Sequence, residues 1–269
     1  MTSTSPKPSR RNVLKIIGGG TLLAAGGAAT FVATRTPADA LAPWQLAGTY
    51  KDPRKRALSY ALLAPNPHNR QPWQVELSQP GRVIIQRDKT KNLPETDPFD
   101  RQLTIGMGCF LETMVIAAAE TGHRVDLALF PEGEDGPVAI ADFVEESAGQ
   151  DPLFSHILNR RSSKEAYDSR RLTAVQAEEL SSFASIVMDE NLADQIRAVT
   201  WGAFKTEVET PRVLQESSDL CRIGKREVNA NPDGLEFHGL FFETLGMLGM
   251  FTRESAADIT STAAQQWFS

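Results

Sequence analysis

The sequence predicts an α+β fold in which a mainly antiparallel sheet is flanked by helices. Apolar residues recur at helical spacing in residues 53–64 and 108–121. Apolar and polar residues alternate on both sides of Gln79-Pro80-Gly81, and this arrangement predicts a β-hairpin, whose strands pair antiparallel. Two further alternating stretches, 123–130 and 137–143, are also expected to be strands.

The first helix is expected to begin at Pro53, because proline is favoured in the first turn, and Pro65 is expected to end it. Its predicted apolar stripe is Ala57, Leu58, Ala61 and Leu62. The three prolines of residues 65–73 then force irregular backbone. In the second helix, which Gly122 ends, one broad face is apolar and comprises Phe110, Leu111, Met114, Val115 and Ala118.

The chain is expected to contain two units after its N-terminal segment, residues 41–146 and residues 151–269. The helices expected in the second unit cover residues 151–159, a stretch that starts at a capping box of Thr173 and Gln176, residues 191–210, and residues 213–229. The apolar run 239–251 needs a cover, so it is expected to be a core element or a flap over a ligand.

The composition is that of a globular protein, with 41% hydrophobic and 23% charged residues in a chain of 269. The formal net charge is −6, and because the first forty residues are basic, the remainder holds 23 basic and 33 acidic residues. So acidic a body repels phosphate backbones, which excludes nucleic acid as a partner. The two cysteines, Cys109 and Cys221, are too few for a disulfide framework or a zinc site, and either form one bridge or stay as two buried thiols.

Residues 1–40 have the order of a secretory signal, with cationic residues before an uncharged stretch, residues 16–34. The run from Ser9 to Lys15, SRRNVLK, matches the twin-arginine pattern, with Val13 where Phe is usual. The small-x-small sequence of residues 38–40, Ala-Asp-Ala, is a site after which a peptidase could cut. We therefore expect export of the folded protein by the twin-arginine machinery to the periplasm or another extracytoplasmic space.

A plain transmembrane helix is the second interpretation of residues 16–34, since about 20 apolar residues span a bilayer. The stretch contains five glycines, which are unfavourable inside a helix, so the signal interpretation is preferred. If the peptidase does not cut, the segment remains as a membrane anchor. No other contact with a membrane is expected.

Two short motifs carry the functional prediction. Residues 65–73, PNPHNRQPW, form a proline-stiffened loop whose amides suit a ring edge that both donates and accepts hydrogen bonds. Residues 160–162, Arg-Arg-Ser, offer guanidinium groups and a hydroxyl that suit a phosphate. Each motif is weak alone, because a proline-rich loop is usually only a turn and a basic doublet after a helix is usually solvated.

Together the motifs resemble those of the FMN-dependent nitroreductase family, whose usual loop is Pro-Ser-x-x-Asn-x-Gln-Pro-Trp; here Asn66 stands at the Ser position. The Arg-Arg-Ser motif follows the loop instead of preceding it, which is similar to a duplicated, twin-arginine-exported subgroup, the mycobacterial Acg proteins. The resemblance implies a nitroreductase-like fold of two fused halves, the second incomplete at a truncated C-terminus, with FMN between them. The implied cofactor-binding residues are Asn66, Asn69, Gln71, Arg160, Arg161 and Ser162.

The resemblance implies an FMN-dependent oxidoreductase that reduces a small-molecule acceptor, such as a nitroaromatic or a quinone, with no catalytic side chain assigned. Residues 239–251 would exclude water from the flavin. Residues 97–108, DPFDRQLTIGMG, are also typical of the subgroup, which places Arg101 near the site without a role. Pairing of two chains in a homodimer stays open. The alternatives are a non-catalytic flavin-binding or flavin-sequestering protein and a truncated, inactive remnant.

Other chemistries are not indicated by the sequence. The four histidines, at positions 68, 123, 156 and 238, lack metal-ligand spacing. The stretch 106–111, GMGCFL, lacks the third glycine of a dinucleotide-binding fingerprint, and no GxSxG sequence is present.

Overall fold

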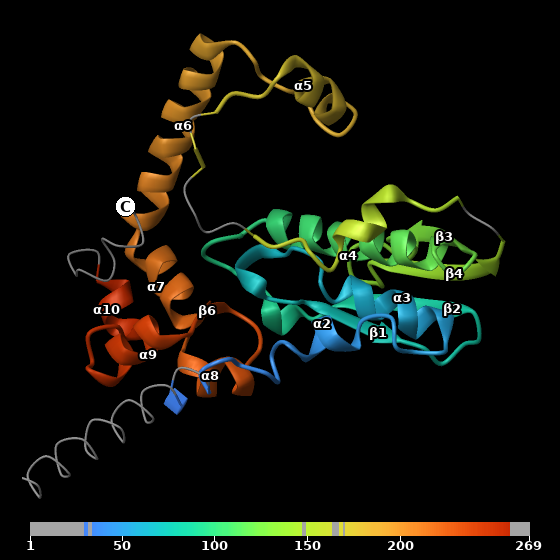
Figure 1. The fold of residues 1–269 in the computed structure, drawn as a ribbon, viewed down its shortest axis with the longest axis horizontal. Coiled ribbons are helices and arrows are strands. Elements are labelled where there is room, and N and C mark those ends of the chain that lie inside the picture. Colours follow the sequence, from blue (N-terminus) through green and yellow to red (C-terminus); the bar gives the residue numbers. More distant parts are fainter. Residues whose placement is uncertain (1–29, 32–33, 147–148, 163–166, 169, 259–269) are drawn as a thin grey trace, which may run out of the picture.

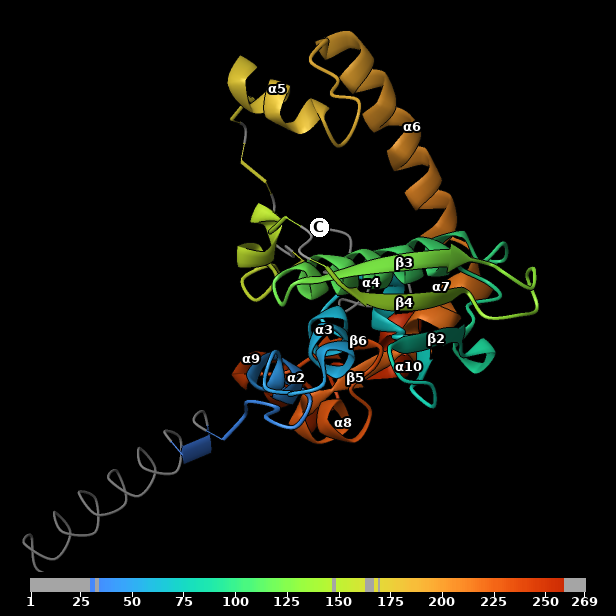
Figure 2. The ribbon, with the colours of Figure 1, turned by 90° about the vertical axis from the view of Figure 1, so that its right-hand side faces the viewer.

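The computed structural model describes residues 30–31, 34–146, 149–162, 167–168 and 170–258 (Figure 1). These residues form a four-stranded antiparallel sheet with helices against it, and a group of short helices around two short parallel strands. The helices α5 and α6 stand away from the sheet in both views (Figures 1 and 2). The predicted α+β class and the antiparallel sheet are confirmed. The predicted signal lies largely outside the described residues.

The first part of the chain supplies the large sheet and its covering helices. In chain order its elements are α2 (Ala42–Leu46), α3 (Pro53–Ala61), the 3₁₀ turn η1 (Pro67–Asn69), β1 (Trp73–Glu76), β2 (Arg82–Arg87), η2 (Lys89–Lys91), α4 (Arg101–Ala119), β3 (His123–Leu129) and β4 (Ala139–Glu145). The remaining elements are η3 (Pro152–His156), α5 (Ala174–Ser181), α6 (Glu190–Val208), α7 (Pro211–Asp219), β5 (Cys221–Ile223), α8 (Gly224–Ala230), β6 (Leu235–Phe237), α9 (Leu240–Met247) and α10 (Arg253–Ala257).

The large sheet has the strand order β1-β2-β4-β3, with every pair antiparallel. The predicted hairpin is confirmed: Trp73 at the start of β1 lies opposite Arg87 at the end of β2. β4 joins β2 on its other edge, with Ala139 opposite Ile85, so the last strand of the sheet in sequence lies inside it. The alternation on β2 buries Val83 and Ile85 on one face, as the period of two requires.

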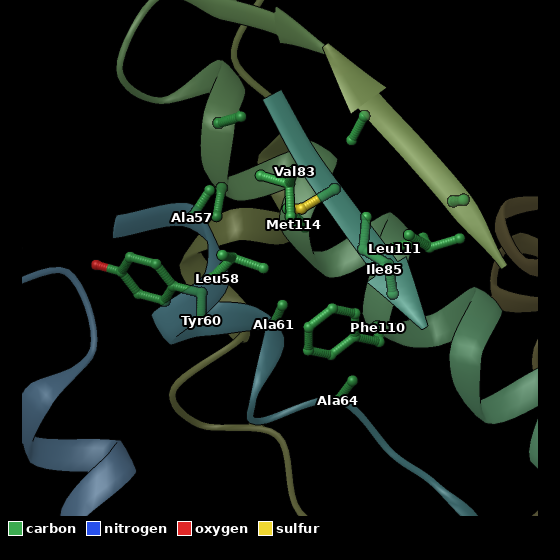
Figure 3. Packing of buried hydrophobic residues seen from close by; sticks show 14 of the residues in the cluster. Ala57, Leu58, Tyr60, Ala61, Ala64, Val83, Ile85, Phe110, Leu111 and Met114 are labelled. Carbon is green, nitrogen blue, oxygen red and sulfur yellow. The ribbon is translucent and has the colours of Figure 1, made fainter. Parts of the chain in front are cut away.

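The core lies between one face of this sheet and the helices α3 and α4 (Figure 3). Phe110 and Met114 of α4 are fully buried against the sheet, and Phe110 stacks on Trp73 with ring centroids 4.8 Å apart. Asp52 caps α3 by accepting the amide hydrogens of Arg54 and Lys55. Within the described residues, α4 is long and apolar enough to cross a membrane, but half of it is buried in this core.

The helix predicted over 108–121 begins earlier, at Arg101. Gly106 and Gly108 lower the helix propensity of this stretch, which hides its first two turns from a sequence-based prediction. Burial of Leu103 outweighs that cost, and the buried Asp97 accepts the amide hydrogen of Leu103 at 2.9 Å. The predicted faces are also wrong in detail, because Leu62 lies beyond the end of α3 and is exposed, and Val115 is only half-buried.

Two helices predicted in the second unit are replaced by other structures. Residues 151–159 contain only the short η3, and the helix predicted over 213–229 is split into α7, β5 and α8. The break follows from long-range pairing: β5 pairs in parallel with β6, Cys221 opposite Leu235, and Gly224 adopts a left-handed φ of +81°. A helix prediction made from local periodicity cannot include this pairing.

The helices predicted to start at Thr173 and to cover 191–210 are confirmed as α5 and α6. Thr173 and Gln176 form the capping box of α5, and α6 covers most of residues 191–210. No residue of α5 or α6 is buried. Among the described residues of the second unit, the strands are β5 and β6 alone, so its relation to the first unit as a fused, related half stays a prediction.

Candidate functional site

The six residues predicted to bind a cofactor line one cavity of about 480 Å³. This volume is within the range of small-molecule and cofactor sites. The walls come from four segments of the chain, within residues 39–44, 62–71, 160–162 and 232–236. Two larger hollows, of about 870 and 620 Å³, contain none of the six residues. The structure thus brings together two motifs that are almost ninety residues apart.

The loop from residue 65 to residue 73 has a strained backbone. His68, Asn69 and Gln71 have φ values of 48°, 51° and 49°, in the left-handed region that non-glycine residues rarely adopt. Asn66 holds the loop in this shape, since its Oδ1 accepts the amide hydrogen of Gln71 at 2.7 Å and its Nδ2 donates to the Ala64 carbonyl at 3.3 Å. Asn66 therefore lies at the cavity but uses its side chain within the loop. Strain of this kind concentrates at functional sites.

Helix α4 touches the same loop at Gly106. A Cβ atom at this position would lie 3.0 Å from Cδ of Pro67 and 3.1 Å from Cβ of Asn66, which is closer than ordinary van der Waals contact. Gly106 therefore allows the core helix to support the loop directly. Gly108, one half-turn further along the helix, faces open space.

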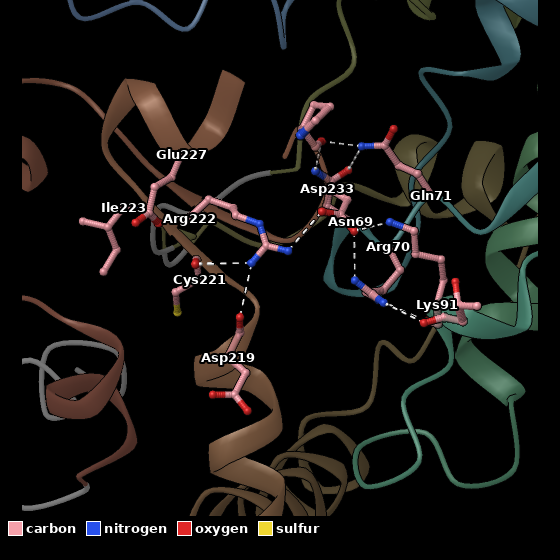
Figure 4. Close-up of polar contacts among 12 residues, drawn as sticks. Asn69, Arg70, Gln71, Lys91, Asp219, Cys221, Arg222, Ile223, Glu227 and Asp233 are labelled. Atoms are coloured by element: carbon pink, nitrogen blue, oxygen red, sulfur yellow. Dashed lines mark hydrogen bonds and ion pairs between the residues drawn. The ribbon is translucent and has the colours of Figure 1, made fainter. Parts of the chain in front are cut away.

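The side-chain amides of Asn69 and Gln71 both meet the carbonyl of Pro232 (Figure 4). Gln71 Nε2 donates to Pro232 O at 2.6 Å and to Asn69 Oδ1 at 3.1 Å, and Asn69 Nδ2 donates to Pro232 O at 3.3 Å. In return, the amide hydrogen of Gly234 is donated to the Asn69 carbonyl at 3.0 Å. The loop is thus joined to the turn that precedes β6.

The next residue of that turn, Asp233, collects three cations (Figure 4). Its carboxylate lies 2.9 Å from Arg70 Nη1, 2.5 Å from Lys91 Nζ and 3.0 Å from Arg222 Nη2. Burial alone would raise the pKa of Asp233, but hydrogen bonds from Lys91 and Arg222 outweigh it and hold the pKa below its ordinary value. Arg70 is itself buried and donates to the Lys91 carbonyl at 3.1 Å. Arg70, itself a loop residue, therefore connects the loop to Lys91 and to Asp233 of the turn.

Arg160 and Arg161 form another wall. Arg160 Nη2 donates to the Leu63 carbonyl at 2.7 Å. The pKa of Arg160 is lowered mainly by burial and, to a smaller extent, by the positive charge of Arg161. The guanidinium of Arg161 lies over the Trp44 ring, 4.7 Å from its centroid. Trp44 Nε1 is buried and its hydrogen has no acceptor, so this residue of the cavity wall contains an unsatisfied hydrogen-bond donor.

The cavity also carries two carboxylates, Asp39 and Glu236. Its lining has formal charges that balance, so an anion has to contact Arg160 and Arg161 directly to be attracted there. Within the described ranges, no group of three or more His, Cys, Asp or Glu side chains could hold a metal ion.

The structure also places His68, the two cysteines and Arg101. His68 of the loop is half-buried beside another, smaller cavity, where its Nε2 lies 3.4 Å from Ser217 Oγ and burial lowers its pKa. Both cysteines are free, Cys221 being buried and Cys109 half-buried, and burial raises the pKa of Cys221 to about 12. Arg101 does not line the cavity that contains the six predicted cofactor-binding residues.

Residues 239–251 contribute nothing to the lining of this cavity. Their buried part forms a separate cluster in which Phe242 and Phe251 pack around Phe237. Five of their large apolar side chains are exposed, namely Leu240, Phe241, Met247, Leu248 and Met250. A flap over a ligand therefore stays a prediction for this segment.

Sequence reasoning missed Trp44 and the contact between the loop and the turn from Pro232 to Gly234. The turn has a clear local signal in Asn231-Pro232-Asp233-Gly234, but this signal does not identify what the turn contacts. Trp44 has no local signal beyond being an aromatic residue close to the predicted peptidase site.

Replacing Gly106 with alanine tests the support of the loop by α4. Gly108→Ala should stabilise the protein by about 0.5–1 kcal/mol, because alanine is the better helix former and nothing opposes its methyl group. Gly106→Ala should instead destabilise it by about 1–3 kcal/mol, since the methyl group meets Pro67 and Asn66. Urea unfolding of both variants measures the difference. Equal stabilisation by both would contradict the close contact.

Replacing Asp233 with asparagine tests the ion pairs behind the loop. Asp233→Asn should lower the free energy of unfolding by at least about 2 kcal/mol near neutral pH, because three cations lose their carboxylate. Because the pKa of Asp233 is lowered on folding, this loss should persist to below pH 3.8 and disappear only in stronger acid. The control Asp135→Asn removes an exposed ion pair with Lys89 and should change stability by less than about 1 kcal/mol. Indistinguishable variants would refute the role of Asp233.

Comparisons with known proteins give distant relatives. No protein-family model matches the chain. A Mycobacterium tuberculosis protein named "Putative NAD(P)H nitroreductase" is 28% identical over 117 residues, which cover 42% of this chain and 33% of the relative. Another from the same organism, "Putative NAD(P)H nitroreductase acg", is 32% identical over 99 residues, which cover 34% of this chain and 29% of the relative.

A third relative, named as an uncharacterized protein of Mycobacterium tuberculosis, is 29% identical over 122 residues and 36% of its own length. The chain thus matches about a third of the length of the curated relatives. The structure, an α+β fold with an antiparallel sheet flanked by helices, is compatible with a nitroreductase-like fold. Two of the three relatives are thus named as putative nitroreductases.

Proposed function

We propose that the cavity binds FMN and that the protein is an FMN-dependent oxidoreductase of the nitroreductase type. One observation carries the proposal: Asn66, Asn69 and Gln71 from the early loop line the same cavity as Arg160, Arg161 and Ser162. The acceptors proposed are small molecules such as nitroaromatics or quinones. When bound, FMN supplies the redox chemistry by taking electrons from a donor and passing them to the acceptor.

The phosphate of FMN would be held by Arg160, Arg161 and Ser162. Two guanidinium groups and a hydroxyl match the acceptor oxygens of a phosphate, and Arg161 is oriented by its position over Trp44. Arg160 is half-buried, so its attraction for an anion is less screened by solvent than that of an exposed arginine.

The flavin ring would meet the loop and Trp44. The Trp44 Nε1–H has no hydrogen-bond partner but is buried, so it would donate to a ring carbonyl only after the Trp44 side chain rotates. The side-chain amide of Gln71 donates to Asn69 Oδ1 and to the Pro232 carbonyl, so its Oε1 is the atom that would accept a hydrogen bond from a ring N–H. The chain's own part in the reaction would be to orient the ring and to keep it in a walled cavity.

Export by the twin-arginine route, to the periplasm or another extracytoplasmic space, belongs to the same proposal. This route carries folded proteins, so FMN could be loaded in the cytoplasm. NAD(P)H is a cytoplasmic reductant, so an exported enzyme would need another electron donor.

A flavin-sequestering protein without catalysis is the second candidate. It is favoured by the bonds of Asn69 and Gln71 to Pro232, because these amide hydrogens are not free to tune a reacting ring in this conformation. The two candidates differ in turnover and not in flavin binding.

Titration of the purified full chain with FMN tests the proposal. Flavin fluorescence should be quenched on binding, and the double variant Arg160→Ala/Arg161→Ala should weaken binding at least about 100-fold, since two charged hydrogen bonds worth about 1.5–3 kcal/mol each are lost. The control Arg124→Ala removes an exposed arginine of β3 and should leave the affinity unchanged. FMN that does not bind, or that binds equally to the double variant, contradicts the proposal.

The same preparation separates the two candidates. Bound flavin that is reduced chemically and then reoxidised by a nitroaromatic or a quinone in repeated turnovers supports the enzyme. Bound flavin that is not reoxidised by either acceptor supports sequestration.

A further inference from the structure

Residues 34–44, here called the clasp, contain the predicted peptidase site and are part of the folded body. We propose that folding closes this site: the clasp is a permanent wall of the cavity, and the folded chain is not cut between Ala40 and Leu41. The inference goes beyond the proposed FMN chemistry, and it rests on the proposed export signal only for the identity of the peptidase.

The backbone N–H groups of both residues at the predicted scissile bond, Ala40 and Leu41, are hydrogen-bonded. The amide hydrogen of Ala40 is donated to Asn229 Oδ1 at 3.3 Å, and that of Leu41 to the Pro37 carbonyl at 3.2 Å. The amide of Ala42 continues the turn by donating to Asp39 O at 3.2 Å. Residues 38–41 thus form a closed turn that leads into α2, whereas a peptidase needs an extended and unpaired backbone.

The clasp is held on the N-terminal side of that bond. Arg35 Nη1 lies 3.0 Å from Glu243 Oε2, and the Glu243 side chain is only 9% exposed. The other oxygen of Glu243 accepts the amide hydrogen of Lys225 at 2.8 Å, while Lys225 Nζ donates to the Thr34 carbonyl at 2.9 Å. Pro37 is fully buried. The segment that cleavage would remove is therefore joined to α8 and α9, which lie beside it in Figure 1.

The clasp is also held on the C-terminal side. Asp39, Ala40, Leu41 and Trp44 line the cavity, and Arg161 lies over the Trp44 ring. The side chains of Ala38 and Asp39 are exposed, so the closure depends on the hydrogen-bonded backbone and not on burial of the small side chains.

Cleavage after Ala40 would separate Arg35 from Glu243 and leave a nearly buried carboxylate without its cation. A folded chain is cut only through locally opened states, and the cutting rate falls with their population. The contacts on both sides of the bond all oppose opening. The retained segment 34–40 would then connect the body to the residues before it.

Elastase, which cuts after small residues, tests the closure without any export pathway. Intact mass and peptide mapping should show rapid cleavage after Ala40 in a synthetic peptide of residues 34–46. The native full chain under the same conditions should be cut there at least about tenfold more slowly. Native chain that is cut after Ala40 as fast as the peptide overturns the proposal.

A double variant tests which contacts slow the cleavage after Ala40. Arg35→Ala/Asn229→Ala should speed cleavage after Ala40 about tenfold or more relative to the native chain, because it removes the ion pair to Glu243 and the acceptor for the Ala40 amide. The matched control Lys89→Ala removes an exposed ion pair on η2 and should cleave as slowly as the native chain. Equal cleavage rates for the native chain, the double variant and the control would show that the clasp contacts do not cause the slow cleavage after Ala40.

The exported protein gives the corresponding result in cells. In a bacterium with a twin-arginine pathway, the exported full chain should keep residues 35–40 by intact mass. An exported chain that starts at Leu41 overturns the proposal. A chain found only in the cytoplasm contradicts the proposed export signal instead, and the elastase comparison still decides the clasp.

Discussion

The contact between the turn at Pro232–Gly234 and the loop at Asn69–Gln71 is the interaction on which the candidate site depends (Figure 4). Hydrogen bonds to Pro232 and from Gly234 join the two backbones, and Asp233 neutralises part of the charge of Arg70, Lys91 and Arg222 beside them. Without this contact, the cavity would lose one wall, and the group of short helices around β5 and β6 would lose one of its polar connections to the first part of the chain.

The loop is a strained element that the rest of the fold keeps in place. Left-handed backbone at three non-glycine residues costs about 1–2 kcal/mol each, although Asn tolerates it better than most. Asn66 from within the loop, Gly106 from the core helix and Pro232 from the far part of the chain together offset this cost. A loop that is held from three directions can present polar groups at fixed positions, which is what recognition of a flat polar ring requires.

The elements that sequence reasoning found are those with local causes. The hairpin follows from alternation around Gln79-Pro80-Gly81, and the start of α5 follows from Thr173 and Gln176, three residues apart. The split of residues 213–229 into α7, β5 and α8 was missed because its cause is pairing with β6. The two cofactor motifs were found through a family resemblance, but the contact of Arg70 with Asp233 spans 163 residues and leaves no local trace in either segment. Trp44 escaped for the same reason, since its role depends on Arg161 and on the wall that the clasp provides.

Amide hydrogen exchange of the full chain tests the joined loop and turn most directly. The amide of Gly234, which donates to Asn69, and the amide of Gln71, which donates to Asn66, should exchange as slowly as amides of the core helix α4. Exchange of both amides at the rate of an unstructured peptide, while α4 stays protected, would show that the loop and the turn are not joined and would contradict this account of the site.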